Sequence, residues 1–438
     1  MEISPERRRE IIAALRKGTV PQRGLDFLAV GMEQFMPVIS DELDETTQGG
    51  SVFKAVRGEY GCGKTFFGRW VQEFAKKKGF ATAEVQISET ETPLHRLETV
   101  YRRAMEQLST PDCFLGAFRS VVDGWFYGLE EEVLAEGQID PSDESALAAK
   151  ADELLEQRLV EITRATPQFA SALRTYRQAQ RNNDHATAEG LAGWLAGQPH
   201  VAASIKREAG IKGEVDHFAA LSFLRGLLLI LKDSGYSGLV LVLDEIETLQ
   251  RVRGDVREKG LNALRQFIDD IDSGRFPNLY MLTTGTPAFF DGPQGVQRLE
   301  PLAQRLHVDF QTDARFDNPR AVQLRLSAFD HSKLIEVGTK VRELYLTDCS
   351  APERIKRLVD PGYIDSLAQA MTGKLGGKVG IAPRLFLKKL VSDVLDRVDQ
   401  YDDFDPRQHY QLTLSAGEMT SVEREAQARS ADDIELDL

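Results

Sequence analysis

Residues 58–65 read GEYGCGKT, a spacing of glycines, lysine and threonine that suits phosphate chemistry. The glycines let the backbone curl so that successive N–H groups face phosphate oxygens, and Lys64 can then reach the β- and γ-phosphates. The hydroxyl of Thr65 can complete the coordination shell of Mg²⁺. We therefore expect a nucleoside triphosphate to bind at Gly58, Glu59, Tyr60, Gly61, Cys62, Gly63, Lys64, Thr65 and Phe66. The Cys62 thiol is expected to be passive, because such a loop uses the backbone at that position.

A second group of chemical residues follows the apolar run 239–243, which ends in Asp244 and Glu245. Two carboxylates at the carboxyl end of a buried strand should lie beside the phosphate-binding loop. Asp244 is expected to hold Mg²⁺ through its water shell, and Glu245 to orient and deprotonate the water that attacks the γ-phosphate. The simpler interpretation is that both acids only cap the next helix. It is disfavoured because residues 58–65 already predict a phosphate site.

A hydroxyl ends the next apolar run, over residues 279–284. Thr284, or its neighbour Thr283, is expected to touch the γ-phosphate or to position the attacking water. A threonine that merely caps a strand explains the pattern nearly as well. The role at the γ-phosphate is therefore supported only by the order of the segments along the chain.

The elements that must position these residues alternate along the chain. Strands are expected at 51–56, 80–87, 238–243 and 279–284, and helices at 66–75, 93–108, 216–232 and 258–271. Strands that alternate with helices predict an α/β fold, here a P-loop NTPase core with a mainly parallel sheet covered on both faces.

The rest of the chain is expected to be helical. We divide it into N-terminal helices (1–50, with helices over 5–17 and 32–43), two parts of the core (51–111 and 214–314), a helical insertion (112–213), a helical lid (315–417) and an acidic tail (418–438). The tail carries seven carboxylates against two arginines and is expected to be disordered, or to become ordered only on a partner. Aromatic residues of the insertion, Trp125, Phe126, Tyr127 and Trp194, are expected to pack inside it rather than to stack on bases.

Composition excludes several classes of protein. With 438 residues, 42% hydrophobic and 28% charged, the chain has the balance of a globular protein, without a membrane-spanning run or secretory signal. Three scattered cysteines encode no disulfide framework, which fits a cytoplasmic location. The net charge of −14 argues against a protein that coats nucleic acid in general, although it is compatible with a local basic groove.

The order of these motifs resembles that of the AAA+ ATPases, over residues 20–108 and 216–400. The resemblance implies a homo-oligomer in which Thr284 is the first sensor and Arg384, at the start of a lid helix, the second. It also implies that Arg305, with Arg298 as a less favoured candidate, is the arginine finger given to a neighbouring subunit. Each arginine has an alternative interpretation as a surface residue or a structural ion pair.

A closer resemblance is to the BrxD family of BREX phage-defence ATP-binding proteins. It rests on residues 20–25, 30–31, 58–65 and 88–95, and extends over nearly the full length. It implies ATP as the nucleotide and work on DNA together with a helicase or other defence-system protein. We expect ATP between core and lid, with Val30 and Gly31 near the adenine.

The leading hypothesis is therefore an ATPase that remodels or loads a DNA-associated partner. An ATP-gated scaffold with little turnover is the alternative. A small-molecule kinase is disfavoured, because the Asp-Glu pair suits activation of water. Direct DNA contact is suggested by the basic residues Arg7, Arg8, Arg9, Arg16 and Lys17. The nearby Glu2, Glu6 and Glu10 suit an ordinary solvated helix face equally well.

Overall fold

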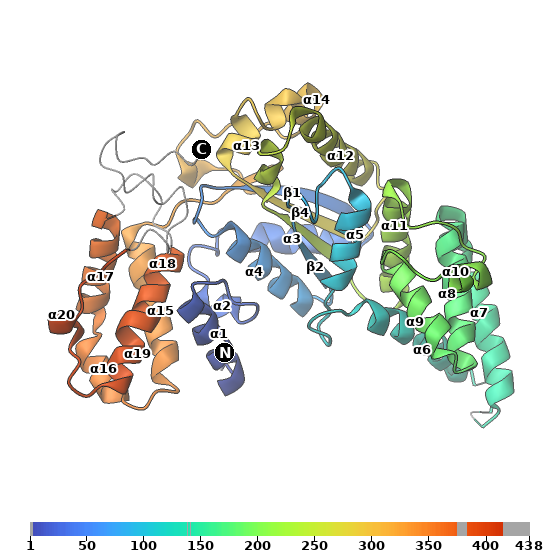
Figure 1. Cartoon of the computed structure of the whole chain (residues 1–438), viewed down its shortest axis with the longest axis horizontal. Helices are drawn as coiled ribbons and strands as arrows, with labels where there is room; N and C mark the ends of the chain where they lie inside the picture. The colour runs from blue at the N-terminus through green and yellow to red at the C-terminus, as the bar shows by residue number, and fades with distance from the viewer. Residues whose placement is uncertain (1–2, 138, 141, 375–382, 415–438) are drawn as a thin grey trace.

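A parallel five-stranded sheet forms the centre of the computed structural model, which describes residues 3–137, 139–140, 142–374 and 383–414 (Figure 1). The predicted acidic tail lies outside these ranges. The strands are β1 (Ser51–Arg57), β2 (Ala81–Gln86), β3 (Leu239–Asp244), β4 (Leu279–Gly285) and β5 (Gln323–Arg325), in the order β2-β3-β4-β1-β5. All neighbouring pairs are parallel. The predicted α/β class is confirmed, and the arrangement is compatible with a P-loop NTPase.

Both faces of the sheet are buried under helices, which explains why the central strands β3 and β4 read as nearly continuous apolar runs. In β3, Leu239, Leu241 and Leu243 pack on one face with α5 (Leu97–Glu106), α11 (His217–Asp233) and α12 (Gly254–Asp272). Val240 and Val242 pack on the other face with α3 (Met36–Thr47) and α4 (Lys64–Lys77). The core therefore has three layers.

The structure corrects several expectations about secondary structure. The helix expected over 93–108 is α5, which begins at Leu97 and ends at Glu106. Residues from 315 onward were expected to be helical, but Gln323–Arg325 form β5 beside β1. This strand is too short for an alternating pattern to appear. The helix expected over 32–43 is α3, which begins at Met36 and ends at Thr47. Pro37 fits its first turn, because a proline there needs no N–H partner, whereas in a helix interior it would break the hydrogen-bond pattern.

Five helices extend the core on one side of the sheet, at the right in Figure 1. They are α6 (Phe118–Ala135), α7 (Glu144–Ala165), α8 (Pro167–Arg181), α9 (His185–Leu195) and α10 (Ala203–Glu208). As expected, Trp125, Phe126 and Trp194 are buried inside them. The expectation for Tyr127 was wrong: its side chain is 61% exposed. The buried stripe of α6 follows Val121, Val122, Trp125 and Phe126, and position 127 lies outside that face.

The two ends of the described chain form one helical unit on the other side of the sheet (Figure 1). It contains α1 (Pro5–Lys17), α2 (Leu25–Leu28), α15 (His331–Leu346), α16 (Pro352–Leu358), α17 (Pro361–Lys374), α18 (Pro383–Lys388), the π-helical segment Lys389–Leu395 and α19 (Asp396–Gln400). Ile11 and Ile12 of α1 share a core with Leu334 and Phe386. Arg16 donates two hydrogen bonds to Asp396, at 2.6 and 2.8 Å. We call this group of helices the terminal unit.

Short helices complete the fold: η1 (Ile246–Gln250), α13 (Pro287–Asp291), η2 (Val296–Arg298), α14 (Glu300–Arg305), η3 (Ala314–Phe316) and α20 (Pro406–His409). In the part of the chain that the structure describes, no helix has both the length and the apolar content needed to cross a bilayer.

Candidate functional site

The loop of residues 58–63 joins β1 to α4 and begins the site. Gly61 and Gly63 have φ of 78° and 97°, a backbone conformation that glycine adopts without strain. A Cβ added to Gly58 would overlap the sulfur of Cys62, which is 3% exposed and fills that space. Burial raises the pKa of the Cys62 thiol, so the side chain stays uncharged in the loop.

The ammonium of Lys64 is held by the loop itself. Its Nζ donates to the carbonyl oxygens of Gly58 at 2.8 Å and Glu59 at 3.3 Å. It lies 5.0 Å from the centre of the Tyr60 ring and 3.7 Å from a carboxylate oxygen of Glu247. Lys64 is 8% exposed, so these groups supply most of the ammonium's surroundings.

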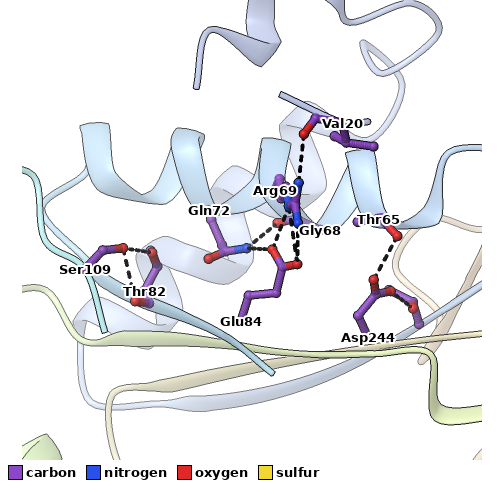
Figure 2. A network of polar contacts seen from close by, with 10 residues as sticks. Val20, Thr65, Gly68, Arg69, Gln72, Thr82, Glu84, Ser109 and Asp244 are labelled. Atoms are coloured by element: carbon purple, nitrogen blue, oxygen red, sulfur yellow. Dashed lines mark hydrogen bonds and ion pairs between the residues drawn. The ribbon is translucent and has the colours of Figure 1, made fainter. Parts of the chain in front are cut away.

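Asp244 joins the loop to the sheet. The hydroxyl of Thr65 donates to one of its carboxylate oxygens at 2.8 Å, as Figure 2 shows, and the hydroxyl of Thr284 donates to the other. The oxygen of Thr284 also accepts a hydrogen bond from the Glu245 N–H at 3.1 Å. Because β4 lies between β1 and β3, it delivers this hydroxyl directly to the end of β3. Of the two threonines considered, Thr284 therefore makes these contacts.

Glu245 leaves the strand in an unusual conformation, with φ of 59° and ψ of 43°. Such backbone strain is found most often at functional sites. Gln86, at the end of β2, donates to the Glu245 carboxylate at 2.9 Å. Gln86 was not identified from the sequence. It pairs with Asp244 across the β2–β3 ladder, so it could be found only once the order of the strands is known.

A cavity of about 290 Å³ lies between the sheet and the terminal unit, and Lys64, Thr65, Asp244 and Glu245 are among the residues that line it. The polar end is formed by Tyr60, Gly61, Gly63, Lys64, Thr65, Asp244, Glu245 and Glu247. The apolar end includes Leu15, Val20, Leu28, Val30, Met32, Phe66, Phe329, Val337 and Leu387. A charged end for phosphates and an apolar end for a flat ring suit a nucleotide.

Other residues predicted to bind the nucleotide lie at the margin of this cavity. Gly58, Glu59 and Cys62 belong to the loop but are not among the residues that line it. Gly31 is next to the lining residue Val30, yet its α-carbon faces Lys333 of α15. Its proximity to the adenine stays a prediction.

The oxygen atoms at the polar end fit Mg²⁺. This ion prefers hard oxygen ligands and usually takes one or two from the protein, with the remainder from phosphates and water. Thr65 and Asp244 provide a hydroxyl and a carboxylate that already contact one another. They are the residues that would hold the ion.

The sequence model of one family, described as BREX system ATP-binding protein BrxC/D, matches residues 3–414. The chain belongs to the BrxC/BrxD family. Its members are ATP-binding proteins of BREX phage defence, which agrees with a cavity whose charged and apolar lining suits a nucleotide. A comparison with curated proteins returned no match.

The three predicted arginines occupy different places in this BrxC/BrxD chain. Arg384, on α18, lines the cavity from the side of the terminal unit. Arg305 pairs with Asp269 at 2.8 Å and Asp272 at 3.0 Å, both on α12, and does not line the cavity. Arg298 is exposed at the end of η2. The predicted roles of all three toward a γ-phosphate stay predictions.

A polar network not identified from the sequence ties α4 to its neighbours (Figure 2). Arg69 donates to the Glu84 carboxylate on β2 at 3.0 Å and to the carbonyl of Val20 at 2.9 Å. Gln72 donates to the same carboxylate at 3.2 Å. Since Val20 lines the apolar end of the cavity, this network fixes that wall relative to the phosphate-binding helix.

Proposed function

We propose that this BrxC/BrxD-family protein is a Mg²⁺-dependent ATP hydrolase of the AAA+ type. The observation that supports this best is the hydrogen-bonded cluster at Asp244, which brings together Thr65 from the phosphate-binding helix and Thr284 from β4. Glu245 follows directly in sequence. A hydroxyl, a metal-binding carboxylate and a second carboxylate at one sheet edge are the groups that hydrolysis of a phosphoanhydride requires.

The proposed mechanism gives each residue one task. Thr65 and Asp244 would hold Mg²⁺, and the bound ion would neutralise charge on the phosphate oxygens. Lys64 binds the β- and γ-phosphate oxygens. The Glu245 carboxylate, oriented by Gln86, accepts a proton from the attacking water, and Thr284 keeps both acids in place.

The AAA+ assignment is supported by two positions. Thr284 lies on the strand between the phosphate-binding strand and the Asp244 strand, as a first sensor would. Arg384 reaches the cavity from a helical unit outside the sheet, as a second sensor would. We further propose that the protein acts as a homo-oligomer, with Arg305 as the arginine finger, and remodels or loads a DNA-associated partner such as a helicase.

The test is the Glu245→Gln variant. We expect ATP to bind within about threefold of the wild-type affinity and hydrolysis to fall by at least about 10²-fold, because the base is lost but the cavity is kept. ATPase rate and particle mass should be measured together, with and without double-stranded DNA. Glu258→Gln, at an exposed carboxylate of α12, is the matched control.

Hydrolysis at the wild-type rate by Glu245→Gln would contradict the proposed base. Loss of hydrolysis with full retention of phage defence in cells would instead favour the ATP-gated scaffold, because turnover would then be dispensable.

A further inference from the structure

Glu247 is a buried carboxylate to which the proposed mechanism gives no task. It lies on η1, lines the polar end of the cavity and is 4% exposed. Among the described residues, no other residue donates a hydrogen bond to either of its carboxylate oxygens. An ionised group in such a place is unfavourable unless an opposite charge lies close.

The opposite charge is the ammonium of Lys64, 3.7 Å away. That ammonium sits between the Glu247 carboxylate, the carbonyls of Gly58 and Glu59, and the ring of Tyr60. The phosphates of a bound nucleotide require the same ammonium. Moving it toward phosphate oxygens takes it away from the carboxylate and leaves Glu247 uncompensated.

We propose that Glu247 is a positioning residue that holds Lys64 back in the loop and thereby lowers the affinity for ATP. When ATP takes the ammonium, the Glu247 carboxylate takes one proton from solvent, which forms its O–H bond. This inference rests on ATP binding at the loop and does not require hydrolysis.

The surrounding charges give the sign of the effect. Burial raises the pKa of the Glu247 carboxyl, the Lys64 ammonium and the backbone N–H of Glu247 itself lower it, and the carboxylates of Asp244 and Glu245 raise it. Loss of the ammonium therefore raises this pKa further, so ATP binding takes up a proton and weakens as the pH rises.

Other charged groups near η1 already have partners. The Tyr60 hydroxyl accepts a hydrogen bond from Arg251 at 3.3 Å. Arg257 of α12 donates to the carbonyl of Leu249 at 3.0 Å, and Asp291 of α13 pairs with Arg57.

Calorimetric titration with Mg²⁺ and a non-hydrolysable ATP analogue tests the proposal. Wild type, Glu247→Gln and the control Glu258→Gln are compared at pH 7.5 in buffers that differ in ionisation enthalpy. We expect Glu247→Gln to bind about fivefold or more tightly than wild type, a coupling of ordinary size, and to take up fewer protons. Its affinity should also change less than that of wild type between pH 7 and 8.5, while Glu258→Gln follows wild type.

Equal or weaker binding by Glu247→Gln, or equal proton uptake by both proteins, would overturn the inference. Thermal unfolding of the variant checks that it is folded. Failure of wild type itself to bind the analogue would contradict the ATP site, whereas normal wild-type binding with an unaffected variant would contradict only the role of Glu247.

Discussion

At the residue scale, Thr284 has the most exacting surroundings. Its side chain is fully buried, its hydroxyl donates to Asp244, and its oxygen accepts from the Glu245 N–H. Removing the hydroxyl leaves the Glu245 N–H without its acceptor and one Asp244 carboxylate oxygen without its donor, beside a buried side chain. Such a loss costs more than the bond itself contributes.

Thr284→Val should therefore lower the free energy of unfolding by about 1–3 kcal/mol. ATP turnover should fall by about tenfold or more, since Asp244 and Glu245 lose their common partner. Urea denaturation and ATPase assays measure the two effects. Thr284→Ser keeps the hydroxyl and should preserve both properties; a Thr284→Val protein as stable and active as wild type would show that these hydrogen bonds contribute little.

The predicted site residues belong to motifs with a fixed spacing, whereas the missed ones are brought to the site by the fold. Residues 58–65 and the Asp244–Glu245 pair have a spacing that is set by the ligand, and this spacing is visible in the chain. Gln86 and Glu247 have no such signature. Gln86 reaches Glu245 because β2 pairs with β3, and Glu247 is placed by the turn of η1 after β3.

At the element scale, the edge strand β2 borders a groove of about 1060 Å³. We call it the β2 groove; its basic residues are Arg7, Arg23, Arg69, Lys76, Lys77 and Arg103. Burial lowers the pKa of Lys76, and the Arg23 guanidinium lies 4.5 Å from the centre of the Phe114 ring. Arg23, Arg69, Lys77 and Arg103 of the groove are paired with acidic side chains, as Arg9 and Arg16 of the basic helix α1 are. Six basic residues line the groove against the four acidic residues Glu73, Glu84, Glu91 and Asp112, so we propose the β2 groove as the surface for DNA, if the protein contacts DNA.

Lys76→Gln should weaken the binding of fluorescent DNA several-fold and reduce the salt slope by about one. Anisotropy titrations at low and moderate salt, with and without an ATP analogue, measure both quantities. Lys356→Gln, at an exposed lysine of α16, is the control and should bind as wild type does. Absence of salt-dependent binding in every nucleotide state would contradict direct DNA contact.

The long elements were predictable because each carries its own periodic pattern, as in β3 or α11. β5 was not, because three residues show no period. The pairing of α1 with α15–α19 was not predictable either, since an apolar helix face does not specify which distant helix will cover it.

At the scale of the whole molecule, variants of Arg305 test the proposal that a second copy of the chain completes the site. Within one chain it pairs with Asp269 and Asp272 and is 41% exposed, so its loss should change stability by no more than about 1 kcal/mol. As an arginine finger it would contribute about 10³–10⁵-fold to the rate.

Arg305→Ala should therefore abolish most turnover at nearly unchanged ATP affinity, and wild-type turnover per subunit should rise with protein concentration. Asp272→Asn removes one of the same ion pairs but keeps the arginine, and should remain active. Equal loss of activity in both variants would indicate a structural ion pair. A protein that stays monomeric with ATP and Mg²⁺ at micromolar concentration would exclude a role in a neighbouring subunit.

The terminal unit also has a consequence for synthesis of the protein. Arg16 and its partner Asp396 are separated by 380 residues, which a ribosome needs roughly 20–80 s to add. During that interval, Ile11, Ile12 and Leu15 of α1 have left the ribosome without the helices that cover them. The apolar face of α1 therefore stays uncovered until α15–α19 have been made. Because Leu15 and Leu387 line the same cavity, the nascent chain cannot complete this cavity before α18 has been made.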